Sequence, residues 1–145
     1  DSSKHSLTWA SHNLALSGMA NKPVRWIAED ALKFIQREAK RGNRYDGLIL
    51  DPPKFGRGTD GKVWDFYKNL PDLLQACQAV LAADARFVVL TAYAIQASAV
   101  IAYQAMLDIV ADRKGKITCG ELVTVEQSAG HILSHALFSR WTSKV

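Results

Sequence analysis

The chain has 145 residues, of which 48% are hydrophobic, and it carries a formal net charge of +4 at pH 7. This composition suits one globular domain with a hydrophobic core and excludes a disordered chain. No apolar run reaches the roughly 18 residues that a membrane-spanning helix needs, and the opening residues, DSSKHS, lack the features of a signal peptide. We therefore expect a cytoplasmic protein without a membrane partner, and the basic excess weakly favours a polyanionic partner.

The first part of the chain predicts two helices and two strands. Residues 4–17 have apolar side chains at helical spacing, and residues 24–27 predict a short strand. Asp30 can cap a second helix that runs to about Lys40. Residues 47–50 form a continuous apolar run, GLIL, which is typical of a buried parallel strand.

The rest of the chain predicts a long loop, two helices and three strands. The Pro- and Gly-rich loop covers residues 51–65. The later elements are a helix over residues 70–81 that begins near Pro71, a buried strand over 86–91, an Ala-rich helix over 95–110, and strands over 117–125 and 136–141. Strands that alternate with helices indicate an α/β fold with a parallel sheet. No helix separates the last two strands, which predicts an antiparallel hairpin at one sheet edge.

The sharpest chemical signal is DPPKF, residues 51–55, directly after the apolar strand. Ligands of open α/β sheets bind beyond the carboxyl ends of the strands, which is where Asp51 is expected. Two prolines fix φ and remove two N–H donors. The Asp51 carboxylate and the Pro52 carbonyl can therefore accept hydrogen bonds from a substrate amine. The alternative is an ordinary Pro-stiffened loop in which Asp51 serves as a cap.

At DPPKF the chain resembles motif IV of the class I S-adenosylmethionine-dependent methyltransferases. It is most similar to the bacterial enzymes related to the 23S rRNA cytosine-5 and guanine-N7 methyltransferases. Residues 1–4, DSSK, and the helix after them are similar to the segment that follows the family's second strand, and residues 29–31 resemble the segment after its third strand. The resemblance implies a Rossmann-like sheet with flanking helices, and S-adenosylmethionine bound by Asp1, Ser2, Asp30, Ala31 and Asp51.

Within that resemblance, Asp1 matches the acid that binds the ribose hydroxyls of the cofactor, and Asp30 matches the acid beside the adenine amine. A carboxylate suits a ribose diol because it accepts charge-assisted hydrogen bonds from both hydroxyls. The alternatives are an unordered terminal residue for Asp1 and a helix cap for Asp30. A helix cap is compatible with a ligand role.

The family's glycine-rich loop and first strands precede the segment with which this chain begins. We therefore expect residues 1–145 to be the C-terminal part of a single methyltransferase domain, in a parent chain with an RNA-binding domain upstream. Helix-start amides and glycines normally let the cofactor approach the backbone. The fragment alone is expected to bind cofactor poorly, to be inactive and to expose an unpaired sheet edge.

The cysteines favour a nitrogen over a carbon as the methylated atom. Cytosine-5 methylation needs a cysteine nucleophile in the loop after a later strand, but that loop here reads TAYAI, residues 91–95. Cys77 and Cys119 fall in a predicted helix and a late strand, where we expect buried, reduced thiols. A nitrogen attacks the methyl group directly, so the enzyme contributes positioning, worth roughly 7–11 kcal/mol. The resemblance thus predicts transfer to a base nitrogen of RNA, with ribosomal RNA as the substrate class.

The loop after the apolar strand also offers candidate RNA-binding residues. A base must leave its stack to react, and aromatic side chains can receive it; the candidates are Phe55, Trp64, Phe66 and Tyr93. A basic group suited to phosphates is formed by Lys54, Arg57 and Lys62. Trp64 is as well suited to anchoring the loop on the core, and the cations to being solvated. The selected substrate-binding residues are Lys54, Phe55, Arg57 and Tyr93.

Two rival functions remain. One is the same chemistry on a protein or small molecule, and the other is a catalytically dead methyltransferase-like binding module. His131 and His135 are four residues apart, but no HExxH motif surrounds them, so we predict no metal. Nothing in the sequence indicates an oligomeric state.

Overall fold

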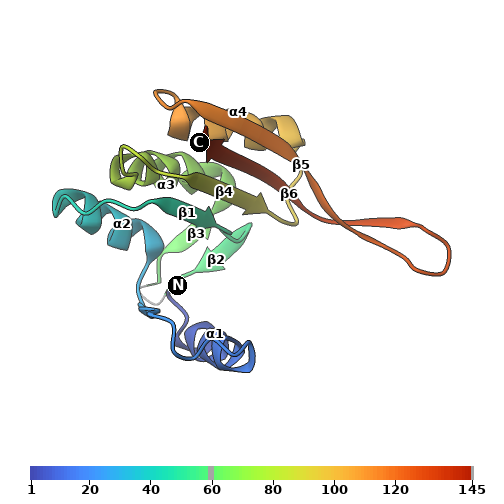
Figure 1. Ribbon diagram of the computed structural model, residues 1–145, viewed down its shortest axis with the longest axis horizontal. Coiled ribbons are helices and arrows are strands. Elements are labelled where there is room, and N and C mark those ends of the chain that lie inside the picture. The colour runs from blue at the N-terminus through green and yellow to red at the C-terminus, as the bar shows by residue number, and fades with distance from the viewer. Residues whose placement is uncertain (59–60, 145) are drawn as a thin grey trace.

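The computed structural model describes residues 1–58 and 61–144 as an α/β fold (Figure 1). Its elements are, in chain order, α1 (Lys4–Leu16), α2 (Ala31–Lys40), β1 (Gly47–Leu50), β2 (Phe55–Arg57), β3 (Val63–Asp65), α3 (Phe66–Val80), β4 (Phe87–Ala92), α4 (Ala99–Val110), β5 (Gly115–Val125) and β6 (Ile132–Ser143). The predicted α/β class is confirmed, but the sheet of the described residues is mixed rather than parallel. No helix among the described residues is long and apolar enough to cross a membrane.

The main sheet has the strand order β1-β4-β6-β5. β1 and β4 are parallel, with Leu50 opposite Leu90 at their carboxyl ends. β6 lies antiparallel to both β4 and β5. The predicted antiparallel hairpin at a sheet edge is therefore confirmed, with β5 as the outer strand and β6 inserted beside β4. Figure 1 shows the far part of this hairpin projecting well beyond the other strands.

The hydrophobic core lies between one face of the sheet and the helices α2, α3 and α4. Val88, Leu90 and Trp141 are among the sheet residues that pack with α3 and α4 in one cluster, and Ile35 of α2 packs with α3 in a second. The prediction of a fully buried β1 is wrong for the described residues. Ile49 points to the opposite face and is 74% exposed, because no described helix covers that face.

α2 is fastened to the sheet at its C-terminal end by Glu38. The Glu38 side chain is buried and accepts hydrogen bonds from the Tyr45 hydroxyl at 2.7 Å and from the Asn43 amide at 2.8 Å. These bonds, with a smaller contribution from Arg41, lower the pKa of Glu38 to about 2. The charged carboxylate thus ties the last turn of α2 to the residue that leads into β1.

Two helices begin at positions that differ from the predicted ones. α3 begins at Phe66, four residues before the predicted start, because the Asp65 side chain accepts hydrogen bonds from the backbone N–H of Tyr67 and Lys68. Pro71 therefore lies inside the helix. α4 begins at Ala99, four residues after the predicted start.

The predicted strand over residues 24–27 is wrong. A strand needs a hydrogen-bonded neighbour. Among the described residues, the backbone hydrogen bonds here are confined to one point, where the Asp1 amino group donates to the Ile27 carbonyl and Glu29 N–H donates to the Asp1 carbonyl. The predicted loop over residues 51–65 contains the antiparallel pair β2–β3 instead. Residues 59–60 of that loop lie outside the described residues.

Candidate active site

Asp51 stands at the carboxyl end of β1, beside the end of β4. The Thr91 hydroxyl donates a hydrogen bond to Asp51 Oδ1 at 2.5 Å and lies 3.4 Å from the Leu50 carbonyl oxygen. Asp51 itself is exposed. Thr91 therefore orients the carboxylate while leaving it open to a ligand. Sequence reasoning gave Thr91 no role, since the β1–β4 register that brings it to Asp51 is needed to find it.

The rest of DPPKF is held by β3 and the start of α3. Pro52 is buried, and the Pro53 carbonyl accepts a hydrogen bond from Trp64 Nε1 at 2.6 Å. The Lys54 carbonyl accepts one from Phe66 N–H at 3.0 Å. The alternative in which Trp64 anchors the loop is therefore confirmed.

The aromatic candidates divide into exposed and buried side chains. Phe55 is 63% exposed and Tyr93 is 43% exposed, whereas Phe66 is 4% exposed within the core. The interpretation of Phe66 as a platform for a base is wrong for this reason. Phe55 and Arg57 alternate with Gly56 along β2, so they point to the same side of that strand. Lys54 and Arg57 are both exposed, as binding of phosphates requires.

Asp1 and residues 27–29 lie side by side. The hydrogen bonds on both sides of Asp1 have the pattern of a single parallel bridge between two strand ends. Asp1 Oδ1 also accepts from Ser3 N–H at 2.7 Å, which orients the carboxylate, so Asp1 is not an unordered end. Asp1 is exposed and Ser2 is half-buried.

Asp30 caps α2, as its alternative predicted, with Oδ1 accepting from Lys33 N–H at 2.9 Å. Ala31 is the first residue of α2 and is exposed. The neighbouring Glu29 makes a two-point ion pair with Arg37, and this hydrogen bonding lowers the pKa of Glu29. The structure thus brings Asp1 close to Asp30, but no hydrogen bond or ion pair in the described ranges joins either of them to Asp51.

No family model matches the chain. It is 34% identical over 78 residues to ribosomal RNA large subunit methyltransferase I of Tolumonas auensis, which covers 54% of this chain and 17% of that protein. It is 26% identical over 85 residues to ribosomal RNA large subunit methyltransferase K of Neisseria meningitidis, covering 58% of this chain and 24% of that protein.

A crystal structure of a SAM-dependent methyltransferase from Agrobacterium tumefaciens superposes with a TM-score of 0.92 and 45% sequence identity. This chain has a class I methyltransferase fold. The match covers 99% of the chain and 48% of the Agrobacterium protein, so the chain spans about half of that structure and a quarter or less of the curated relatives above. The fold is also shared by SMU.776 complexed with SAH, at a TM-score of 0.67 and 16% identity.

The two cysteines lie in α3 and β5, outside the DPPKF segment. Cys77 is fully buried between α2 and α3, and burial raises its thiol pKa to about 12. Cys119 is exposed on β5, so the expectation of two buried thiols is wrong for it.

The two late histidines lie on the projecting hairpin. His131 Nδ1 is 3.1 Å from a Glu126 carboxylate oxygen across its turn, and His135 contacts Thr124. Across residues 1–58 and 61–144, no group of three His, Cys, Asp or Glu side chains is arranged to hold a metal ion.

Proposed function

We propose that this chain is part of an enzyme that transfers a methyl group from S-adenosylmethionine to a base nitrogen of RNA, with ribosomal RNA as the substrate class. The observation that carries the proposal is the exposed Asp51 carboxylate, oriented by Thr91 at the carboxyl end of β1. It occurs in a chain that is 45% identical, over 99% of its length, to a SAM-dependent methyltransferase. The names of the curated relatives support ribosomal RNA as the proposed substrate class.

The carboxylates near the chain's start suit the cofactor's polar groups. Asp1 and Asp30 each use one oxygen to accept a backbone N–H, and no described residue donates to their second oxygens. Those second oxygens can accept from the ribose hydroxyls and the adenine amine, respectively. Ser2 and Ala31 adjoin them. When bound, S-adenosylmethionine supplies an electrophilic methyl group on a positively charged sulfur.

Asp51 and Pro52 are proposed to hold the target base. The free Asp51 oxygen and the Pro52 carbonyl accept hydrogen bonds from the amine or ring edge, which directs the nitrogen lone pair at the methyl carbon. As the new nitrogen–carbon bond forms, the carbon–sulfur bond breaks with its electron pair left on sulfur, and the displaced nitrogen proton passes to water. This chemistry needs alignment rather than a protein nucleophile.

The thiols support nitrogen over carbon as the acceptor. A covalent cytosine mechanism requires a thiolate at the base, and the loop over residues 91–95 contains no cysteine. Cys77 is buried with its thiol pKa raised to about 12, so it stays protonated and unreactive at neutral pH. The other substrate contacts are proposed to be stacking on Phe55 and Tyr93, and phosphate contacts from Lys54 and Arg57.

The test is methyl transfer from radiolabelled S-adenosylmethionine to unmodified ribosomal RNA by the complete protein. We expect label in RNA, recovered as an N-methylated nucleoside after nuclease digestion, and its loss in Asp51→Ala. Asp84→Ala is the matched control, because Asp84 is an exposed carboxylate in the turn before β4. Label confined to protein or small molecules would contradict an RNA substrate, and a C-methylated nucleoside would contradict a nitrogen acceptor.

A further inference from the structure

The first turn of α3 makes a hydrogen-bonded contact with the loop that joins β4 to α4. The Tyr67 hydroxyl accepts a hydrogen bond from Gln96 N–H at 2.9 Å and lies 3.5 Å from the Gln96 carbonyl oxygen, to which it donates. The two residues are 29 positions apart in the sequence. One phenol thus satisfies both backbone groups of a loop residue that has no strand or helix to pair with.

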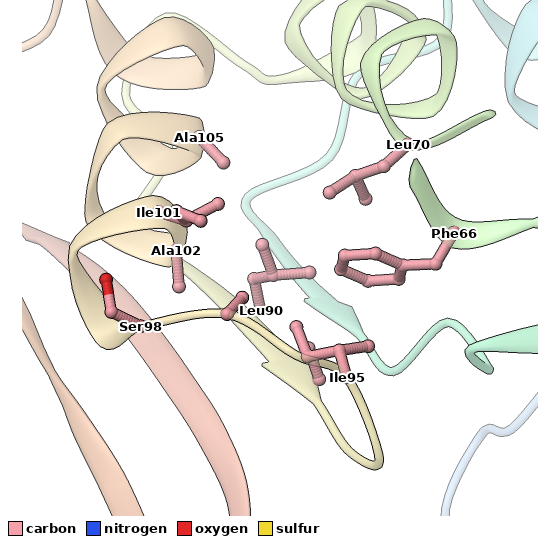
Figure 2. Close-up of a pocket in the computed structure, with 10 residues that line it drawn as sticks. Phe66, Leu70, Leu90, Ile95, Ser98, Ile101, Ala102 and Ala105 are labelled. Atoms are coloured by element: carbon pink, nitrogen blue, oxygen red, sulfur yellow. The ribbon is translucent and has the colours of Figure 1, made fainter. Parts of the chain in front are cut away.

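The same loop has a second, apolar anchor and an unusual backbone. Ile95 points into a small pocket beside Phe66 and Leu90 (Figure 2). Ala94, which precedes it, has a φ of 55°, in a left-handed region that non-glycine residues adopt at a cost. A strained conformation persists where surrounding contacts determine it. The contacts of Ile95 and of Gln96 with Tyr67 follow this position directly along the chain.

The start of α3 also holds the other loop at the candidate site. Phe66 N–H donates to the Lys54 carbonyl, and Trp64, just before the helix, donates to the Pro53 carbonyl. Asp65 caps the helix that carries Tyr67. The first turn of α3 and the β3 residue Trp64 therefore fasten two segments, the DPPKF segment that contains Asp51 and the loop that begins at Tyr93.

We propose that Tyr67 is a positioning residue for the RNA substrate. Its hydrogen bonds to Gln96 hold the loop that carries Tyr93 in a fixed position relative to Asp51. The inference rests on the proposed methyl transfer to RNA. Thr91, which contacts Asp51, lies two residues before Tyr93, so the loop's path from β4 decides where the Tyr93 ring stands relative to the carboxylate. A base held by Asp51 stacks on the Tyr93 ring only when the loop keeps the conformation in which Gln96 is hydrogen-bonded to the Tyr67 hydroxyl.

Tyr67→Phe removes the hydroxyl that bonds to Gln96 and leaves the aromatic ring in place. The ring keeps its edge-to-face packing on Phe66, with centroids 5.6 Å apart, and Asp65 still caps α3. Gln96 N–H loses its acceptor, so the loop gains freedom. Among the described residues, no hydrogen bond or ion pair joins Tyr67 to Asp1 or Asp30, which are proposed to bind the cofactor. Cofactor affinity is therefore expected to stay the same.

The experiment compares Tyr67→Phe with Tyr103→Phe in the complete protein. Tyr103 is a half-buried residue of α4 whose hydroxyl has no hydrogen-bond partner among the described residues, so it controls for loss of a phenol. In Tyr67→Phe we expect the KM for ribosomal RNA to rise roughly three- to tenfold, as loss of one neutral hydrogen bond gives. We expect kcat and the Kd for S-adenosylhomocysteine to stay within twofold, and the Gln96 amide to exchange hydrogen for deuterium faster.

The outcomes separate this inference from the proposed function. If the unaltered protein methylates RNA and Tyr67→Phe has the KM of Tyr103→Phe, positioning by Tyr67 is refuted while the function stands. Faster exchange at Gln96 without a change in KM refutes it equally, because a freed loop then does not affect the substrate. A fall in kcat with an unchanged KM also refutes it, because Tyr67 would then act on the chemical step rather than on substrate binding. No transfer to RNA by the unaltered protein overturns the proposed function, and the inference with it.

Discussion

Asp51→Asn replaces one carboxylate oxygen, a hydrogen-bond acceptor, with an NH₂ donor and preserves the shape of the side chain. Its remaining oxygen can still accept from the Thr91 hydroxyl, which now donates to Asp51 Oδ1 at 2.5 Å. The second oxygen becomes an NH₂ group, which donates and therefore cannot accept from a base amine. Asp51 is exposed, and within residues 1–58 and 61–144 its side chain makes no hydrogen bond or ion pair besides the one with Thr91. The free energy of unfolding should therefore stay within about 0.5 kcal/mol of the unaltered protein.

The catalytic cost follows from the bond that is lost. A hydrogen bond to a charged group contributes about 1.5–3 kcal/mol, and two donors left facing each other cost about 1–3 kcal/mol more. A total near 4 kcal/mol corresponds to a loss of about 10²- to 10³-fold in kcat/KM for RNA. Thr91→Val removes only the orienting bond to the carboxylate, which contributes about 1.5 kcal/mol at the lower end of the same range, so it should cost about tenfold.

The assay is steady-state methyl transfer to ribosomal RNA by the complete protein, with urea unfolding measured on the same samples. The reasoning is refuted if Asp51→Asn keeps kcat/KM within fivefold of the unaltered protein. It is also refuted if Thr91→Val loses as much activity as Asp51→Asn, because the carboxylate's second oxygen would then have no separate role.

Two further predictions concern phosphate binding and acid stability. Changing both Lys54 and Arg57 to Ala should weaken the binding of RNA of every sequence. It should also reduce the slope of log K against log salt by about 1.5–2, because each lost phosphate contact releases one counterion fewer. An unchanged slope in a filter-binding assay would show that neither side chain touches phosphate. The pKa of Glu38 is lowered from 4.5 to about 2 by its hydrogen bonds from Tyr45 and Asn43, so its stabilising effect is fully present above pH 4.5 and is lost as the pH falls toward 2. Glu38→Gln should be less stable than the unaltered protein at pH 7, and its stability should fall less as the pH drops from 4.5 toward 2. Urea unfolding midpoints between pH 7 and pH 2.5 measure both effects. Equal losses in the two proteins would contradict a stabilising role for the hydrogen bonds of Glu38 with Tyr45 and Asn43.

The features that the sequence predicted correctly depend on local interactions. Asp30 caps α2 by bonding to an amide three residues away, and the apolar run 47–50 followed by Pro-Pro places Asp51 at a strand end. The last two strands form a hairpin because no helix separates them. Patterns of this kind are readable because the cause lies within a few residues of the effect.

The errors occur where a distant partner decides the local structure. The segment over residues 24–27 has the residues of a strand, but its backbone hydrogen bonds within the described part of the chain lie only around Asp1. Backbone groups need a neighbouring strand to form a ladder. β2 and β3 form in a segment rich in turn residues because they pair with each other, and the bond from Trp64 to Pro53 secures the segment between them and β1. Phe66 is a core residue because α3 turns it toward β4 and α4.

The sequence by itself determined the fold class, the order of most elements and the position of Asp51 at the end of β1. Only the tertiary structure decided how that carboxylate is oriented and what holds the loops around it. Thr91 reaches Asp51 across 40 residues, and Tyr67 reaches Gln96 across 29. The physical reason is that hydrogen bonds depend on distance and direction in space, and for these pairs both are set by strand register and helix packing rather than by spacing along the chain.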